Sequence, residues 1–124
     1  MPAQAANTLQ LQVAGLTPGA SLPLAQAYNR GGCHGANHSP QLRWSHAPAG
    51  TRSFAITLFD PNARNGRGWW HWVVWNIPAR AHGLPDNAAQ RLPKNVHQSH
   101  NDFGSHGYGG PCPPPGETHH YVIT

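Results

Sequence analysis

The chain has 124 residues, with eight basic, four acidic and ten histidine side chains, 14 glycines and 13 prolines. Glycine and proline together stay just below the share of roughly 25–30% at which disorder becomes the expectation, and five tryptophans indicate a packed domain. Frequent prolines and glycines exclude long helices, and no apolar run approaches the roughly 20 residues that cross a bilayer. The basic side chains are scattered. We therefore predict a β-rich domain that is not transmembrane and has no nucleic-acid partner.

The first half of the chain contains three predicted strands. Apolar and polar residues alternate over residues 9–13, which predicts a strand with one side in water. Residues 29–40 are rich in turn formers and predict a loop. A short strand follows around Leu42 and Trp44, and residues 53–59 predict a longer one from their β-branched and aromatic content. This strand ends at Asp60.

The strongest predicted strand covers residues 69–77, which include four of the five tryptophans. Strict alternation would place Trp69, His71, Val73, Trp75 and Ile77 on one face and Trp70, Trp72, Val74 and Asn76 on the other. Both faces are largely apolar, so we expect this strand inside a sheet that is covered on both sides. Residues 78–110 predict a long irregular excursion, and residues 120–123 begin a last strand.

Three polar side chains fall where predicted strands meet loops, namely Asp60, His71 and His119. Residue spacing alone leaves His71 equally well explained as a hydrogen-bonded core histidine, and Asp60 as a turn opener. The glycine- and proline-rich residues 109–116 favour a binding role, because glycine lets backbone N–H groups approach a ligand closely. Imidazoles together with open N–H groups form an anion site suited to a phosphate monoester.

Several motifs, taken in order, resemble the phosphatidylethanolamine-binding protein family, and most closely its bacterial branch, often called Raf kinase inhibitor-like. The similarity extends from about residue 29 to residue 124, and any one of the motifs alone would be weak. The motifs are residues 35–44 (GANHSPQLRW), 60–63 (DPNA), 70–78 (WHWVVWNIP), 101–104 (NDFG), 107–114 (GYGGPCPP) and 119–121 (HHY).

This resemblance implies a central antiparallel sheet, a second smaller sheet and a shallow pocket that binds phosphate or phosphoryl headgroups. It also implies a protein that is not an enzyme and has no cofactor. Its ligand would be phosphate, a phosphorylated small molecule or a lipid headgroup, and it could restrain a kinase or another partner. Carried over by position, the pocket residues are Asp60, Pro61, His71, Gly110, Pro111, His119 and Tyr121.

The chain departs from the family pattern at several positions. Asn62 and Arg64 stand where the family has aspartate and proline, which makes the pocket rim more positive and should disfavour a zwitterionic ethanolamine group. His120 replaces a permanently charged arginine. Family members continue past residue 124 with an apolar stretch and a helix. We therefore expect residues 1–124 to be a single, C-terminally truncated domain with a more open pocket.

The spacing of the two cysteines, Cys33 and Cys112, excludes a CxxC redox motif and a four-cysteine zinc site. They form a disulfide only if the chain is exported, and otherwise are buried thiols. The family resemblance implies that both lie beside pocket loops, which makes their pairing plausible. The N-terminus as written has no signal peptide, which leaves the cytoplasm and the periplasm open.

The sequence also leaves open a different function and a homodimeric state. Ten histidines and Asp60 suggest a metal-binding or metal-dependent hydrolytic protein, although no HExxH or paired-cysteine spacing is present. A homodimer also remains open.

Overall fold

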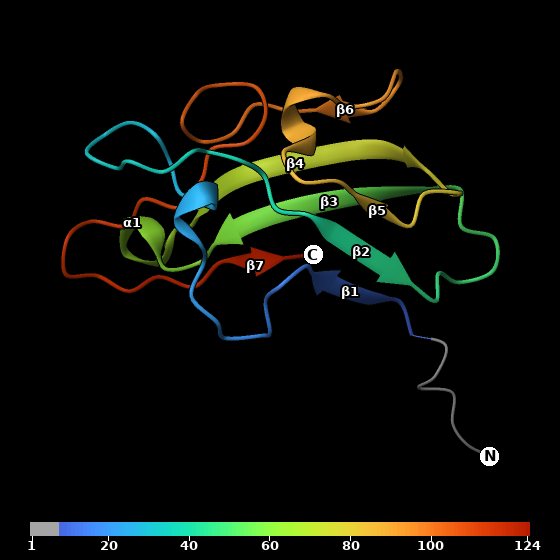
Figure 1. Cartoon of the computed structure of the whole chain (residues 1–124), viewed down its shortest axis with the longest axis horizontal. Coiled ribbons are helices and arrows are strands. Elements are labelled where there is room, and N and C mark those ends of the chain that lie inside the picture. Colours follow the sequence, from blue (N-terminus) through green and yellow to red (C-terminus); the bar gives the residue numbers. More distant parts are fainter. Residues whose placement is uncertain (1–7) are drawn as a thin grey trace, which may run out of the picture.

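The computed structural model describes residues 8–124, so the predicted absence of a leader falls outside the described residues. The chain folds into two antiparallel sheets, which confirms the mostly-β prediction (Figure 1). The larger sheet has the order β6 (His97–Gln98), β4 (Trp69–Pro78), β3 (Ser53–Asp60) and β7 (Val122–Ile123). The smaller sheet has the order β1 (Gln10–Val13), β2 (Leu42–Ser45) and β5 (Gly83–Leu84). Three short helical turns complete the elements: η2 (Leu24–Gln26), α1 (Ala63–Gly66) and η3 (Ala88–Gln90).

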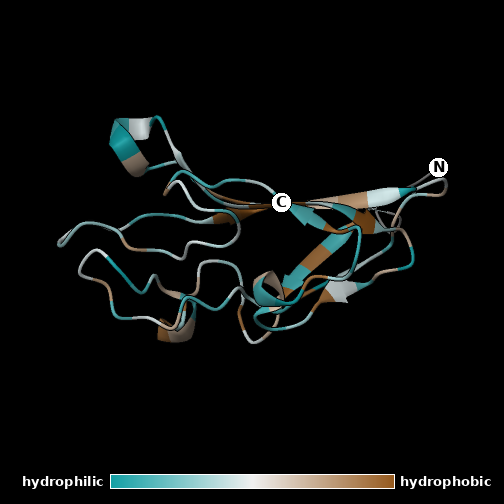
Figure 2. Ribbon diagram, turned by 90° about the horizontal axis from the view of Figure 1, so that it is seen from above, coloured by the Kyte–Doolittle hydropathy of each residue, from teal (hydrophilic) through white to brown (hydrophobic). Residues whose placement is uncertain are grey.

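The hydrophobic core includes buried side chains from both sheets. Leu42 and Trp44 of β2 are buried because alternate residues of this strand point toward the core, as its sequence pattern predicts. In Figure 2 the hydrophobic colour is concentrated on the strands, whereas the connecting loops are mostly hydrophilic or neutral. The larger sheet contributes Ile56, Leu58, Trp72, Val74 and Ile77 to the same cluster.

Strand β4 does not alternate regularly, because the pairing with β3 shifts twice. Phe54 pairs with Ile77 and Ile56 pairs with Val74, so β4 carries one extra residue there, and Asn76 adopts a left-handed φ of 61°. This bulge returns Ile77 to the buried face. The predicted division of β4 into two strictly alternating faces is therefore wrong.

The second shift lies at the other end of β4. Leu58 pairs with Trp72 and Phe59 pairs with Trp70, which leaves His71 as the extra residue. Bulges commonly redirect a side chain next to a functional site. The exact position of His71 is therefore set by this irregularity of the sheet, and regular alternation would not predict it.

The face of the larger sheet that points away from the core is partly open in the described part of the chain. Trp70 is 42% exposed and Trp75 is 47% exposed, and Val122 of β7 is similarly accessible. Trp70 contacts Phe59, with ring centroids 4.3 Å apart. The prediction that both sides of β4 are covered is therefore wrong for residues 8–124.

The excursion after β4 is irregular, as predicted, but hydrogen bonds fix it against the sheet. The indole N–H of Trp72 donates to Gln98 Oε1 (2.8 Å), and Gln98 Nε2 donates to the carbonyl of Ala89 (2.8 Å). Asn101 is buried and closes its own loop through bonds to Ser105 and Gly107. Among residues 8–124, no helix is long and apolar enough to span a membrane.

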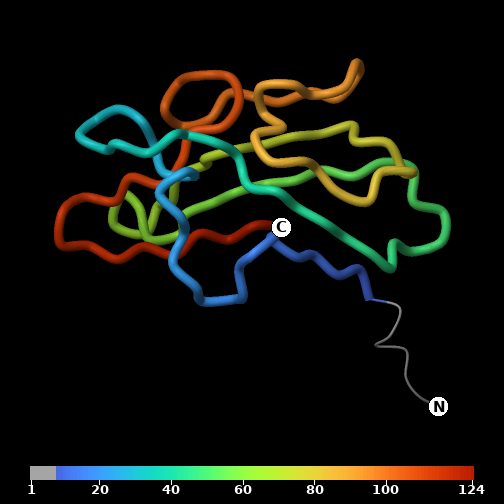
Figure 3. Tube along the Cα trace, viewed as in Figure 1, coloured from blue at the N-terminus to red at the C-terminus, as the bar shows by residue number. Residues whose placement is uncertain are grey.

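The two ends of the described chain run close together. Residues 11–22 and residues 117–123 line a common groove of about 1340 Å³, and Figure 3 shows the blue and red segments approaching each other there. Its apolar side chains include Leu11, Val13 and Ile123, which also pack partly against the core.

Candidate functional site

A cleft of about 410 Å³ lies where β3 ends and β4 begins. Four of the predicted pocket residues line it, namely Asp60, His71, His119 and Tyr121. Pro61, Gly110 and Pro111 do not line it. Its other lining residues, several of which the motifs did not single out, are Asn62, Ala63, Arg64, Asn65, Trp69, Phe103, Cys112, Pro113, Pro114 and Glu117.

Asp60 ends β3 and is only 2% exposed, so its carboxylate requires partners. Its Oδ1 accepts the backbone N–H groups of Asn62 (2.8 Å) and Ala63 (3.2 Å), which is the turn that the sequence Asp-Pro favours. Its Oδ2 lies 2.5 Å from Nδ1 of His119. Asp60 is therefore both a turn opener and a member of the cleft.

The imidazole of His119 lies between two carboxylates, with Nδ1 toward Asp60 and Nε2 2.7 Å from Glu117 Oε1. The hydrogen bonds that His119 donates to Glu117 and Asp60 raise its pKa above the usual value of 6.5, because both carboxylates stabilise the imidazolium. Both ring nitrogens are engaged, so His119 positions the carboxylates and offers no free donor to a ligand. We infer a supporting role for it in place of direct contact.

The carboxylates of Asp60 and Glu117 bind opposite edges of the His119 ring, so their oxygens do not converge on a single point. Within residues 8–124, no group of three or more histidine, cysteine, aspartate or glutamate side chains could hold a metal ion. The geometry of the described residues therefore gives the metal-binding alternative no support.

Replacing His119 by glutamine should change how stability depends on pH. The raised pKa of His119 means that its stabilising contribution is complete below about pH 6.5, the unfolded value, and is lost as the pH rises through the folded value. We therefore expect the thermal midpoint of the native protein to fall as the pH is raised from 6.5 toward 9.

The measurement is a series of thermal unfolding curves across this pH range for the native protein and His119→Gln. The variant should lose the slope, because glutamine does not titrate. His46, which is exposed and bonds only its neighbour Ser45, provides the control His46→Gln. Equal slopes in the native protein and His119→Gln would contradict the assignment.

His71 is buried at the β4 bulge. Its Nδ1 lies 2.6 Å from the carbonyl oxygen of Gly109, and because a carbonyl can only accept, Nδ1 carries the hydrogen. Burial lowers the pKa of His71 below 6.5 despite the opposing effects of the Gly109 carbonyl and of Asp60. His71 is therefore neutral at pH 7, with the Nε2 lone pair free. Tyr121 and Phe103 meet its ring edge-on.

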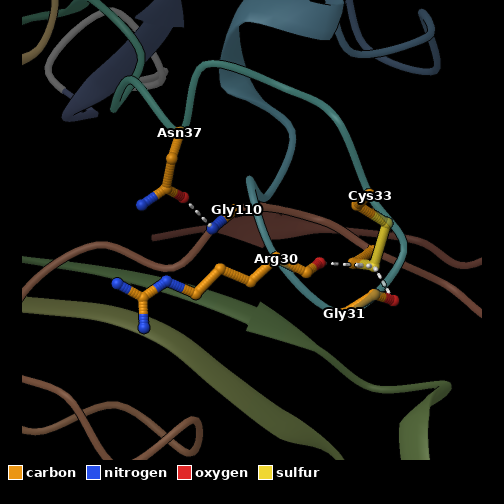
Figure 4. Close-up of a disulfide and its surroundings, with 6 residues drawn as sticks. Arg30, Gly31, Cys33, Asn37 and Gly110 are labelled. Carbon is orange, nitrogen blue, oxygen red and sulfur yellow. Dashed lines mark hydrogen bonds between the residues drawn. A yellow bond between two sulfur atoms is a disulfide. The ribbon is translucent and has the colours of Figure 1, made fainter.

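The glycine pair does not provide the open N–H groups that the sequence suggested. The N–H of Gly109 donates to the carbonyl of His71 (3.0 Å), and that of Gly110 donates to Asn37 Oδ1 (2.7 Å), as Figure 4 shows for Gly110. A Cβ on Gly110 would lie 2.0 Å from the Gln26 carbonyl oxygen. Gly110 thus serves the packing of two backbone segments, and the expected backbone anion cradle is wrong here.

Cys33 and Cys112 form a disulfide, with their Cα atoms 6.0 Å apart (Figure 4). Of the two alternatives that the sequence left open, the structure therefore shows the bonded pair. The bond anchors the start of the cleft wall, because Cys112 is followed by Pro113 and Pro114, which both line the cleft.

Two hydrogen-bond donors at the cleft have no partner in the described structure, the indole N–H of Trp69 and the hydroxyl of Tyr121. Burial, and to a lesser degree the charge of Asp60, raises the pKa of Tyr121, so its hydroxyl stays protonated. Buried polar groups without partners are rare in folded proteins and usually indicate a missing ligand or water. The sequence did not identify Trp69, because a tryptophan in an apolar strand looks like a core residue.

The family model described as phosphatidylethanolamine-binding protein matches residues 13–124 of this chain, which is most of its length. The chain belongs to this family. The comparisons thereby confirm the similarity found in the motifs.

Three curated proteins are similar to the chain. It is 49% identical over 108 residues to the YbcL protein of Escherichia coli, covering 83% of this chain and 59% of YbcL. It is 47% identical to YbhB of the same organism, and the match covers 88% of this chain and 71% of YbhB. It is 39% identical to LppC of Mycobacterium tuberculosis, which is named a putative lipoprotein, and the match covers 99% of this chain and 57% of LppC. The chain thus spans somewhat over half the length of YbcL and LppC.

The solved structure of YbcL, described as a new member of the mammalian PEBP family, confirms the fold. It superposes with a TM-score of 0.88 at 45% identity, and the match covers 93% of this chain and 73% of the solved one. The two-sheet architecture is therefore the fold of the phosphatidylethanolamine-binding protein family.

Proposed function

We propose that the cleft binds the phosphoryl group, or a similar oxyanion, of a small molecule or lipid headgroup, without catalysing a reaction. The observation that carries this proposal is that two residues lining one cleft, Trp69 and Tyr121, each have a buried donor without a partner. An oxyanion supplies the acceptors that these donors lack, and bonds to charged acceptors are stronger than those between neutral groups.

His71 adds a third contact of a different kind. Its neutral Nε2 can accept a hydrogen bond from a singly protonated phosphate oxygen, or can take up a proton and then donate a hydrogen bond to a fully ionised oxygen. The volume of about 410 Å³ lies at the small end of the range of about 300–1,000 Å³ for ligand pockets. A headgroup-sized ligand fits this space.

Binding without turnover is supported by the groups that line the cleft. Among the described lining residues there is no serine, threonine or lysine, and the sulfur of Cys112 is held in the disulfide. His119 is engaged by two carboxylates, so it is not free to act as a base toward a ligand. The side chains present thus suit recognition better than nucleophilic catalysis.

Replacing Tyr121 by phenylalanine tests the proposal by removing one donor while keeping the ring. A hydrogen bond to a charged group contributes about 1.5–3 kcal/mol, so inorganic phosphate should bind roughly 10- to 150-fold more weakly. Calorimetric titration gives the affinity, and the resonances of His71 and of the Trp69 indole N–H should shift in the native protein. Tyr28→Phe is the matched control, because Tyr28 stacks on Phe103 without lining the cleft.

No phosphate-induced shift at either His71 or Trp69 in the native protein would overturn the proposed function. Equal affinities of the native protein and Tyr121→Phe would remove Tyr121 from the site.

Sulfate tests the role of His71, because sulfate stays a dianion near neutral pH and has no proton to donate. It should therefore bind more tightly when His71 is protonated and can donate to it. The pKa of His71 in the free protein lies below 6.5, so sulfate affinity should rise up to about tenfold per unit as the pH falls from 8. It should level off below that pKa.

His119 also faces the cleft and titrates, but at higher pH because its pKa is raised. The comparison variant is therefore His71→Asn, which should retain only the slope that His119 causes. If His71→Asn shows the same pH dependence as the native protein, His71 does not contact the anion.

A further inference from the structure

We propose that Arg64 contacts the bound phosphoryl ligand and sets the preference of the cleft, favouring phosphate monoesters with an anionic or neutral substituent over those with an ammonium group. This inference rests on the proposed function, since it concerns the same cleft. Among the described lining residues, Arg64 is the only arginine or lysine.

The backbone at Arg64 adopts a conformation that non-glycine residues usually avoid. Arg64 and Asn65 have φ values of 51° and 57°, in the left-handed region that costs roughly 1–2 kcal/mol per residue. Backbone bonds close the turn, from Gly68 N–H to the Ala63 carbonyl (3.0 Å), and Arg64 Nε donates to the carbonyl oxygen of Gly68 (2.9 Å). The loop thus returns the arginine side chain toward the start of β4.

Two further contacts place the guanidinium at the cleft. Its central carbon lies 5.0 Å from the ring centroid of Trp69, the same indole whose N–H has no partner. Its Nη2 lies 3.5 Å from Asp102 Oδ2. A cationic group and an unpartnered neutral donor therefore belong to the same wall.

The ion pair with Asp102 leaves Arg64 able to bind a ligand. The Arg64 side chain is 51% exposed, and exposed ion pairs are weak because water screens them. Asp102 Oδ2 also accepts the backbone N–H of Trp70 at 2.7 Å, so this carboxylate keeps a strong partner if the guanidinium moves. Guanidinium has five N–H donors, of which one bonds the Gly68 carbonyl while the Nη2 group faces Asp102.

The negative groups of the cleft also have partners. Asp60 is bound by two backbone N–H groups and by His119, and Glu117 Oε1 shares the same imidazole. Of the two acidic side chains that line the cleft, only Glu117 is open to an ammonium group of the ligand, and the imidazole of His119 lies next to it. A carboxylate or a further oxyanion would meet Arg64 next to the donor of Trp69. The charges thus favour the anionic substituent.

Three two-carbon phosphate monoesters test this inference by calorimetry: phosphoglycolate, ethyl phosphate and phosphoethanolamine, with an anionic, a neutral and a cationic substituent. The native protein should bind them in this order of decreasing affinity, with about three- to tenfold between the first and the last. Arg64→Ala and Arg64→Gln should bind all three more weakly and with nearly equal affinities. Asp102→Asn should tighten phosphoglycolate binding, because the guanidinium loses its competing carboxylate.

Arg67→Ala is the matched control, because Arg67 is an exposed cation of the same loop that does not line the cleft, and it should keep the native order. A native order that survives in both Arg64 variants, or a native preference for phosphoethanolamine, would overturn the inference and leave the proposed function standing. If the native protein binds none of the three monoesters, nor phosphate, the proposed function itself fails.

Discussion

Reduction of the disulfide between Cys33 and Cys112 is expected to lower the free energy of unfolding by about 2–5 kcal/mol. The two cysteines are 79 residues apart in sequence, so the bond closes most of the chain into one loop. In the chain-entropy treatment a loop of this length accounts for about 4–5 kcal/mol, because the bond restricts the unfolded ensemble. A small domain is typically stable by only about 5–15 kcal/mol, so this loss is a large fraction.

Urea unfolding of the oxidised protein, with and without dithiothreitol, measures this effect. The double variant Cys33→Ser/Cys112→Ser should match the reduced protein and should not respond to the reductant. Oxidised and reduced midpoints that coincide would contradict the prediction. A loss of this size means that the domain has its full stability only where thiols stay oxidised, as in the bacterial periplasm.

Replacing Gly110 by alanine should be strongly destabilising, at or above the upper end of the range of about 1–3 kcal/mol for overpacking. The added Cβ would lie 2.0 Å from the Gln26 carbonyl oxygen and 2.8 Å from the carbonyl carbon of Ala27. Both are backbone atoms, so no side-chain rotation relieves the contact. The segment around η2 must therefore move away from Gly110, which also threatens the bond from Gly110 to Asn37.

The control for this variant is Gly50→Ala in the turn before β3. Gly50 has a φ of 87° and nothing within 4 Å of an added Cβ, so only left-handed strain of roughly 1–2 kcal/mol is expected. Denaturant unfolding compares the two variants. A smaller loss of stability in Gly110→Ala than in Gly50→Ala would show that the two segments separate at little cost.

Side-chain chemistry made the strands predictable, but it did not show which residues of each strand point toward the core. The β-branched and aromatic residues of β3 and β4 predict strands because such side chains suit a pleated, half-buried surface. The bulges at His71 and near Asn76 depend on pairing with β3, which residue types along one strand do not encode. One extra residue reverses the inside-outside pattern beyond it, so Ile77 is buried with Val74 against the predicted alternation.

The candidate site was partly predictable for a similar reason. Asp60, His71, His119 and Tyr121 come from motifs, and the structure brings them to one cleft. The glycine-rich sequence predicts an open N–H at Gly110, but a side chain far away in sequence, that of Asn37, accepts this N–H. A long-range partner such as Asn37, and a missing partner such as that of the Trp69 indole N–H, can be identified only when the tertiary structure is known.

The covalent loop between Cys33 and Cys112 has a topological consequence for a cleaved chain. Arg80 lies at an exposed position between β4 and β5, inside this loop. A single cut there separates Asp60 and His71 from His119 and Tyr121 in sequence, yet the two fragments stay joined through the sulfur atoms. The cleft residues would thus remain on one covalently connected molecule after a proteolytic nick, and only reduction would let the two pieces diffuse apart.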